Sequence, residues 1–114
     1  MEIHPLQITV EQIDSAAIVH AVGDISAVNI DPFRQAIATA IAKKPTKLVI
    51  DLTGTMFLSS PGLAVLVQTL QLSQRGGCSL ILAGANERVG GIFEIARLSD
   101  VFKMTPTLEA ALAN

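Results

Sequence analysis

The spacing of apolar residues along this chain changes between the pattern of buried strands and that of amphipathic helices. Residues 48–52 are apolar at nearly every position, as in a strand that is covered on both faces. From Leu63 onward the apolar residues recur at intervals of three and four, which predicts a helix with one buried stripe. In the polar turn between them, Ser60 is the expected N-cap and Pro61 the expected first helical residue.

This turn is the candidate functional stretch, because it presents the hydroxyls of Ser59 and Ser60 at a helix N-terminus. Free N–H groups and the helix dipole favour negative charge there. The pattern therefore indicates a place that can read or receive a phosphate. The competing explanation is purely structural, with Ser60 as a cap and Ser59 as a solvated turn residue.

The rest of the chain repeats strand and helix patterns in the order β-β-α-β-α-β-α-β-α. The first two strands form a hairpin, the loop Gly23–Ser26 ends the second of them, and helices then alternate with strands. This alternation predicts right-handed crossovers and a mixed sheet that is parallel apart from the hairpin. The predicted fold class is α/β, a single domain over residues 1–114 with four helices. The predicted strands cover residues 8–13, 16–22, 48–52, 78–83 and 101–104, and the predicted helix caps are Asp31, Ser60, Asn86 and Thr105.

The composition is that of a globular chain, with 50% hydrophobic and 16% charged residues. No apolar run approaches the roughly 20 residues that cross a bilayer, and the N-terminus lacks the regions of a signal peptide. We therefore expect a cytoplasmic protein without direct membrane insertion. A net charge of −2 and the absence of Trp and Tyr argue against nucleic acid binding. The single cysteine leaves no basis for an internal disulfide or a cysteine metal cluster.

Motifs of the common enzyme classes are missing from the sequence. It contains no Gly-x-Ser-x-Gly elbow, no phosphate-binding loop and no dinucleotide fingerprint, and its two histidines, His4 and His20, form no metal-ligand pattern. His20 lies in an apolar strand, which favours a packed histidine over a catalytic base. A triad of Ser60, His20 and Asp51 has no support from their spacing. We expect no enzyme activity, no metal and no cofactor.

Four segments, spread over nearly the whole chain, follow the order and spacing of one known family. They are the turn Phe57–Leu63, the loop Val22–Ser26, the pair Gly76–Gly77 before Ile81–Ala83, and the helix Val89–Leu98. Together they resemble the STAS domain, and in particular the anti-sigma factor antagonists of that family. The resemblance implies a partner that is an anti-sigma factor and serine kinase of the ATPase type. In the antagonists, phosphorylation by that kinase ends the binding.

The chain departs from the family pattern at the phosphorylated turn. In the antagonists this turn reads Asp-Ser-Ser/Thr-Gly-Leu, and the hydroxyl before the glycine accepts the phosphate. Matched residue by residue, the glycine is Gly62 and the acceptor position is Pro61, which has no hydroxyl. Ser59 and Ser26 stand where the family carries carboxylates, and their neutrality suits a phosphate of roughly −1.5 to −2 charges. Either the domain binds its partner without phosphate control, or Ser60 or Ser59 has become the acceptor.

The expected function is a non-enzymatic protein–protein interaction module, an anti-sigma factor antagonist in a bacterial partner-switching pathway. The expected partner-binding residues lie in the loop and in the turn: Gly23, Asp24, Ser26, Ser59, Ser60, Pro61 and Gly62. The alternative is a STAS scaffold subunit of a larger signalling or transport assembly, without a phosphorylation switch. A third hypothesis is a small-ligand or nucleotide binder that uses the same helix N-terminus, and self-association stays open.

Overall fold

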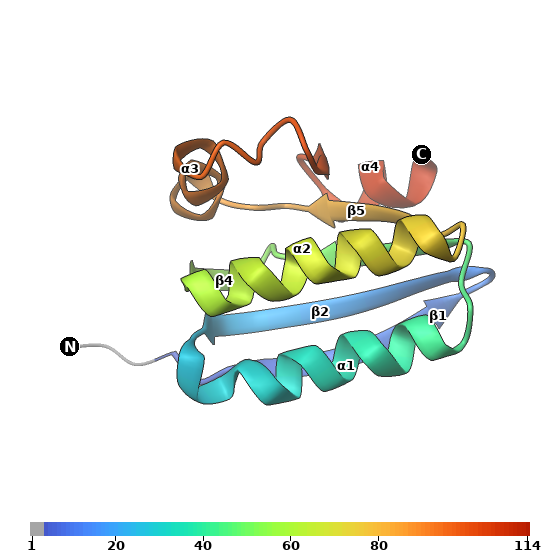
Figure 1. Cartoon of the computed structure of the whole chain (residues 1–114), viewed down its shortest axis with the longest axis horizontal. Coiled ribbons are helices and arrows are strands. Elements are labelled where there is room, and N and C mark those ends of the chain that lie inside the picture. The colour runs from blue at the N-terminus through green and yellow to red at the C-terminus, as the bar shows by residue number, and fades with distance from the viewer. Residues whose placement is uncertain (1–3) are drawn as a thin grey trace.

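The computed structural model describes residues 4–114, which form one six-stranded sheet with helices on both faces (Figure 1). The strands are β1 (Gln7–Ile13), β2 (Ala16–Ile25), β3 (Lys47–Asp51), β4 (Thr55–Leu58), β5 (Ser79–Ala83) and β6 (Lys103–Thr105). The helices are α1 (Ile30–Ala42), α2 (Ser60–Arg75), α3 (Glu87–Ile95) and α4 (Leu108–Ala113), with a short 3-10 helix, η1 (Ala27–Asn29), before α1. Within this range, no helix has the length and apolar character needed to cross a membrane.

The order of strands across the sheet is β1-β2-β3-β5-β6, and β4 pairs with the end of β2 outside this path. β1 and β2 are antiparallel, whereas the other pairs are parallel. At the centre Val19, Ile50 and Leu82 lie side by side in register, and none of them is exposed to solvent. The predicted α/β class, with an N-terminal hairpin, a mixed sheet and four helices, is confirmed.

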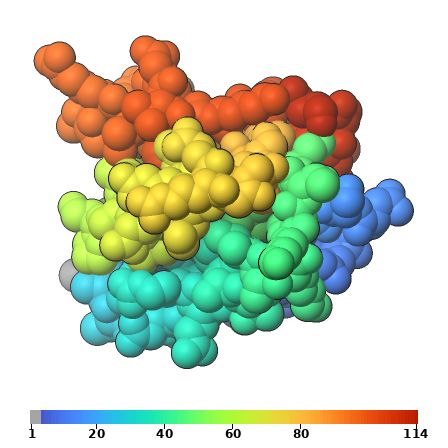
Figure 2. All heavy atoms as spheres, turned by 45° about the vertical axis from the view of Figure 1, so that its right-hand side comes forward, coloured from blue at the N-terminus to red at the C-terminus, as the bar shows by residue number. Residues whose placement is uncertain are grey.

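The core has two layers, one on each face of the sheet. On one face α1, α2 and α3 bury apolar side chains such as Phe33, Leu66 and Phe93 in a single cluster against the strands. Figures 1 and 2 show α1 and α2 lying side by side over this face. On the other face Ala111 of α4 packs against Ile18 and its neighbours in β3 and β5. This arrangement brings the beginning of α2, β4 and α3 together at one end of the molecule (Figure 1).

Two of the predicted helix caps belong to α2 and α3, and only one of them is correct. Asn86 caps α3, since its Oδ1 accepts a hydrogen bond from Val89 N at 2.9 Å. At α2 the prediction is wrong by one residue, because Ser59 is the cap, Ser60 the first helical residue and Pro61 the second. Ser59 has the extended backbone that a cap requires, and a proline loses no helical bond anywhere in the first turn.

The predicted caps of the first and last helices are also displaced. α1 follows Asn29, and Asp31 lies in its first turn, where it pairs with Arg34 at 2.8 Å. α4 is capped by Thr107 and not by Thr105, whose hydroxyl donates to the Thr107 carbonyl oxygen instead. The physical reason is the same in both places. Proline fits several positions in and before a first turn, so a polar residue followed by proline does not fix the start of a helix.

The strands differ from the prediction mainly around β4, which the apolar pattern did not reveal. β2 does not end at Val22 but continues to Ile25, and its last residues pair with β4. A register shift between Gly23 and Asp24 allows this second pairing. Gly23 has a φ of +111°, and a Cβ there would lie 2.3 Å from the Pro5 carbonyl oxygen. β6 covers Lys103–Thr105, so it begins two residues later and ends one residue later than the predicted strand.

Candidate functional site

Ser59 joins the sheet to the start of α2. Its backbone N–H donates to the Ile25 carbonyl oxygen at 2.9 Å, and its own carbonyl oxygen accepts from Leu63 N at 2.9 Å. Its hydroxyl oxygen accepts from Gly62 N at 3.4 Å as the helix cap. Ser59 is half-buried, and its hydroxyl oxygen serves as the acceptor that caps the helix.

Ser60 differs from Ser59 in both exposure and bonding. Its side chain is exposed, and its hydroxyl makes no hydrogen bond to any other residue in the part of the chain that the structure describes. Pro61 is exposed beside it. The first turn of α2 contains no acidic residue, so no side-chain carboxylate compensates the positive end of the helix dipole. Ser60 is therefore the free hydroxyl of this turn.

Gly62 is buried, and its role is to let α2 approach the sheet. A Cβ at this position would lie 2.6 Å from Leu58 Cδ1 and 2.8 Å from Ile25 Cγ2. Both distances are shorter than real Cβ contacts. The glycine thus shapes the turn from below, while Ser60 and Pro61 supply its surface.

The predicted Gly23–Ser26 loop is mostly strand, because β2 continues to Ile25 and only Ser26 follows it. Gly23 N donates to the Gly54 carbonyl oxygen at 2.9 Å, and Asp24 N donates to that of His4 at 2.8 Å. Asn29 then fixes the turn that follows, since its Oδ1 accepts from Ser26 N at 2.7 Å and its Nδ2 donates to the Asp24 carbonyl oxygen at 2.8 Å. Gly23 is buried, whereas Asp24 and Ser26 are partly exposed.

The structure brings the two predicted segments together and adds apolar residues that the sequence did not single out. In the β2–β4 pairing Asp24 lies opposite Phe57, directly before the Ser59 turn. The side chain of Phe57 is 44% exposed, and that of Val28 in η1 is 96% exposed. No local sequence signal distinguishes Val28, because Ile25, Ala27 and Ile30 around it are apolar as well. Contiguous apolar patches with a polar rim mark protein interaction sites, whereas single exposed apolar side chains are common on protein surfaces.

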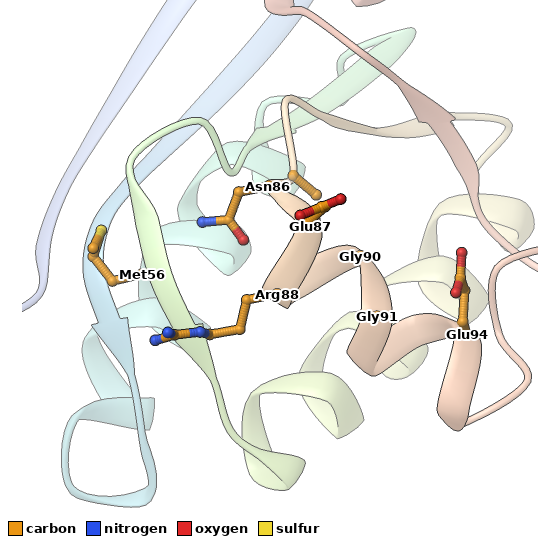
Figure 3. A pocket seen from close by; sticks show the side chains of 8 residues that line it. Met56, Asn86, Glu87, Arg88, Gly90, Gly91 and Glu94 are labelled. Atoms are coloured by element: carbon orange, nitrogen blue, oxygen red, sulfur yellow. The ribbon is translucent and has the colours of Figure 1, made fainter.

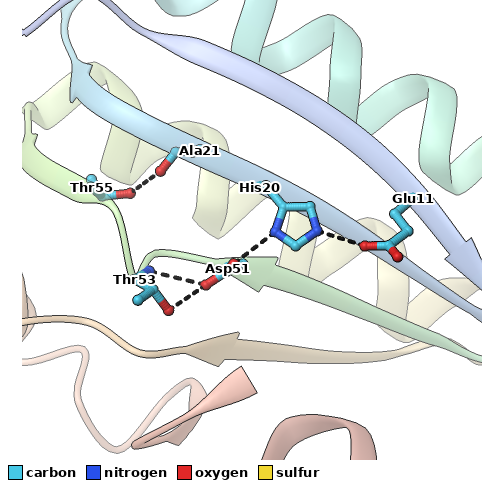
Figure 4. A network of polar contacts seen from close by, with 6 residues as sticks. All are labelled: Glu11, His20, Ala21, Asp51, Thr53 and Thr55. Carbon is cyan, nitrogen blue, oxygen red and sulfur yellow. Dashed lines mark hydrogen bonds and ion pairs between the residues drawn. The ribbon is translucent and has the colours of Figure 1, made fainter. Parts of the chain in front are cut away.

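A separate polar cluster surrounds His20 (Figure 4). Its Nδ1 lies 2.7 Å from Asp51 Oδ2 and its Nε2 lies 2.9 Å from Glu11 Oε1. The other oxygen of Asp51 accepts from Thr53 N at 3.0 Å and from Thr53 Oγ1 at 2.6 Å. His20 is therefore not simply a packed histidine, because its side chain is 23% exposed and bonded to two carboxylates. In the described chain no hydrogen bond links Ser60 to His20 or Asp51, so these residues form no triad.

The charges of this cluster shift the pKa values of its members in opposite directions. Burial alone would lower the pKa of His20, but hydrogen bonds and charges from Glu11 and Asp51 outweigh it and raise that pKa above its ordinary value. Burial alone would raise the pKa of Asp51, but hydrogen bonds from Thr53 and then from His20 lower it. Residues 4–114 contain no group of three His, Cys, Asp or Glu side chains that could hold a metal ion.

Comparison with known proteins places this geometry in a family. A model of the STAS domain matches residues 7–111. The anti-sigma-F factor antagonist RsfA of Mycobacterium tuberculosis is 32% identical over 110 residues, which are 95% of this chain and 86% of RsfA. The anti-sigma-B factor antagonist of Listeria monocytogenes is 30% identical over 82 residues, 72% of each chain.

Solved structures agree with these matches. The crystal structure of an anti-sigma factor antagonist from Mycobacterium paratuberculosis superposes with a TM-score of 0.84 at 30% sequence identity, and the match covers 96% of this chain and 92% of that one. SpoIIAA in its unphosphorylated form superposes with a TM-score of 0.79 over 93% of this chain and 92% of its own, but at 18% identity it supports the fold alone. This chain therefore belongs to the STAS domain family.

Proposed function

We propose that this chain is a cytoplasmic anti-sigma factor antagonist, without enzyme activity, that binds an anti-sigma factor of the serine-kinase, ATPase type. The proposal is supported by the similarity of this chain to two anti-sigma factor antagonists, those of anti-sigma-F and anti-sigma-B. The anti-sigma-F factor antagonist aligns with 95% of this chain. The binding face consists of the end of β2 with the residue that follows it (23–26), η1 (Ala27–Asn29) and the start of α2 (59–62). We refer to it as the partner face.

One observation carries the proposal, namely the hydrogen bond from Ser59 N to the Ile25 carbonyl oxygen at 2.9 Å. It holds the start of α2 against the end of β2, although the two segments are more than thirty residues apart in the sequence. The exposed apolar side chain of Val28 lies on η1, which contacts α2. η1 is also joined to the end of β2, since Asn29 Nδ2 donates to the Asp24 carbonyl oxygen at 2.8 Å. A central apolar contact within a polar rim is the usual anatomy of a protein interface.

Ser60 is the phosphate acceptor in this proposal, if the kinase modifies the turn. Pro61 has no hydroxyl, and the hydroxyl of Ser59 already accepts the capping hydrogen bond from Gly62 N. A phosphate on Ser60 carries roughly −1.5 to −2 charges at pH 7, and the helix N-terminus stabilises it. The same charge lies in the middle of the partner face, where it weakens the binding of a partner that is complementary to the uncharged turn.

The first test is affinity capture of the chain from its own cells, with mass spectrometry of the bound proteins. We expect an anti-sigma factor with an ATPase-type kinase domain among them. Recovery of transporter or multi-subunit sensor components instead would favour a scaffold subunit and contradict the proposal. Phosphosite mapping after incubation with the captured kinase and ATP should find Ser60, and phosphate confined to residues far from this turn would exclude the moved acceptor.

The second test measures the affinity of the purified chain for that anti-sigma factor by titration calorimetry. We expect Ser60→Glu and Pro61→Arg to weaken binding at least tenfold, because each places a charge on the partner face. Gln74→Arg is the matched control, since Gln74 is exposed at the other end of α2. Equal affinity of all three variants and the wild type would remove the first turn of α2 from the interface.

A further inference from the structure

A cleft of about 1140 Å³ lies between β4 and α3, outside the residues assigned above to the partner face (Figure 3). Met56 of β4 lines one side, and Gly90 and Gly91 line α3. Met56 is 41% exposed, so the cleft contains an accessible apolar group. Charged side chains of α3 also line the cleft.

The two glycines of the cleft have no explanation in the packing of the fold. A Cβ on Gly90 or on Gly91 would have no neighbour within 4 Å, in contrast to Gly62, where two side chains lie closer than 3 Å. Glycine within a helix is less stable than alanine because it loses more backbone entropy on folding. The effect of the pair is to leave this side of α3 open beside Met56.

β4 contacts both α3, which lines the cleft, and the end of β2, which belongs to the partner face. Asn86 Nδ2 donates to the Thr55 carbonyl oxygen at 3.2 Å, which ties the start of α3 to the first residue of β4. The last residues of β4, Phe57 and Leu58, pair with Asp24 and Ile25 of the partner face. A protein that covers the end of β2 therefore lies within one short strand of the cleft.

The charges around the cleft define the chemistry of an occupant. Glu87 and Glu94 are seven residues apart on α3 and flank the glycine pair, while Arg88 extends toward β4 (Figure 3). Within residues 4–114 none of these three side chains forms an ion pair. Two carboxylates and one guanidinium leave an excess of negative charge on the rim. An apolar side chain with a basic residue next to it is complementary to this cleft.

We propose that the cleft between β4 and α3 docks such a segment, an apolar side chain flanked by a basic residue, of the same anti-sigma factor that binds the partner face. This inference rests on the proposed function. The apolar side chain lies over Gly90 and Gly91 against Met56, and the basic residue pairs with Glu94. The antagonist thus holds its partner at two adjacent places, of which only the first contains the serine turn.

The test uses Gly91→Trp, which fills the cleft without touching the partner face. Because nothing lies within 4 Å of the added Cβ and tryptophan is a better helix former than glycine, the variant should melt no lower than the wild type. We expect at least tenfold weaker binding to the captured anti-sigma factor. Ile95→Trp is the matched control, since Ile95 is 87% exposed on α3 and does not line the cleft, and its affinity should equal that of the wild type. Glu94→Arg should weaken binding more at low salt than at high salt.

The outcomes of this test show whether the cleft binds a segment of the anti-sigma factor or a second copy of this chain. Wild-type affinity in Gly91→Trp, or equal losses in Gly91→Trp and Ile95→Trp, would overturn the inference and leave the proposed function standing. Absence of binding by the wild-type chain would remove both. Light scattering on the free protein covers the remaining case, because a wild-type dimer that Gly91→Trp converts to a monomer would assign the cleft to a second copy of this chain instead.

Discussion

His20 and Asp51 face each other across neighbouring strands, with the imidazole Nδ1 2.7 Å from the carboxylate Oδ2 (Figure 4). The other ring nitrogen lies 2.9 Å from Glu11 Oε1. A neutral imidazole has one N–H and can donate to one carboxylate only, whereas the protonated ring donates to both. The geometry therefore fits a charged His20 that joins β1, β2 and β3.

The same cluster extends to the partner face through the β3–β4 turn. Asp51 accepts two hydrogen bonds from Thr53, and the next residue, Gly54, accepts one from Gly23 N at 2.9 Å. A series of hydrogen bonds thus connects His20 to a turn that contacts the end of β2.

We expect the free energy of unfolding to fall as the pH rises from about 6 to about 8. The pKa of His20 is raised in the folded protein, so the folded state keeps a proton that the unfolded chain releases above its ordinary pKa of 6.5. The stabilisation is fully present below that value and is lost as the pH rises through the higher folded pKa.

On the acid side, Asp51 acts in the opposite sense. Its pKa is lowered in the folded protein, so it stabilises the fold above its ordinary pKa of 3.8. This contribution disappears as the pH falls through the lower folded pKa. Urea denaturation over a pH series that extends from about 3 to about 8 measures both effects.

His20→Gln is the control for the neutral end of that series. The variant cannot gain the charge, so its free energy of unfolding should change less than that of the wild type between about pH 6 and 8. The other histidine, His4, is present in both proteins, and the difference between the two curves therefore isolates His20. Parallel curves would show that the pair contributes nothing to pH-dependent stability.

Alanine substitution of two glycines in different helices should change the free energy of unfolding in opposite directions. Gly62→Ala forces a methyl group to within 2.6 Å of Leu58 and 2.8 Å of Ile25, and we expect a loss of about 1–3 kcal/mol from overpacking. Gly90→Ala meets no atom within 4 Å, and we expect a gain of about 0.5–1 kcal/mol from improved helix propensity. Urea denaturation of both variants measures the pair, and changes of the same sign would contradict this account of the two positions.

The architecture followed from the sequence because most of its elements carry strong apolar periodicity. Val19, Ile50 and Leu82 belong to strands that are apolar on both faces, and a parallel sheet buries both faces. β4 escaped prediction since it has only four residues and two of them, Met56 and Phe57, are exposed. Its existence depends on pairing with β2, which is a tertiary contact that no local pattern contains.

The candidate site, like the fold, could be predicted from the sequence only in part. Ser59, Ser60 and Pro61 could be located from turn chemistry, but which serine caps the helix depends on backbone angles that the sequence does not fix. The cluster of Glu11, His20 and Asp51 could not be found, since its members come from three strands and meet only through the sheet register.

Removal of each serine hydroxyl separates the cap from the exposed residue. We expect Ser59→Ala to lower the free energy of unfolding by about 0.5–1 kcal/mol, since it removes the 3.4 Å bond to Gly62 N. Ser60→Ala should be close to neutral, because the Ser60 hydroxyl bonds to no other described residue. Denaturant unfolding measures both. A larger loss for Ser60→Ala would mean that Ser60, and not Ser59, caps α2.

The last prediction concerns Ser60→Glu, which should raise stability and lower affinity in the same protein. The first turn of α2 has no acidic residue, so a carboxylate there gains about 0.3–1 kcal/mol from the free N–H groups and the helix dipole. Ser60→Lys should change the melting temperature in the opposite direction, and both should weaken binding of the anti-sigma factor. Thermal melting and titration of the same samples test this. Opposite changes in stability with a common loss of affinity exclude unfolding as the cause, because a damaged fold would lower both quantities. If Ser60→Glu destabilised the protein, its weaker binding would no longer support a partner face at this turn.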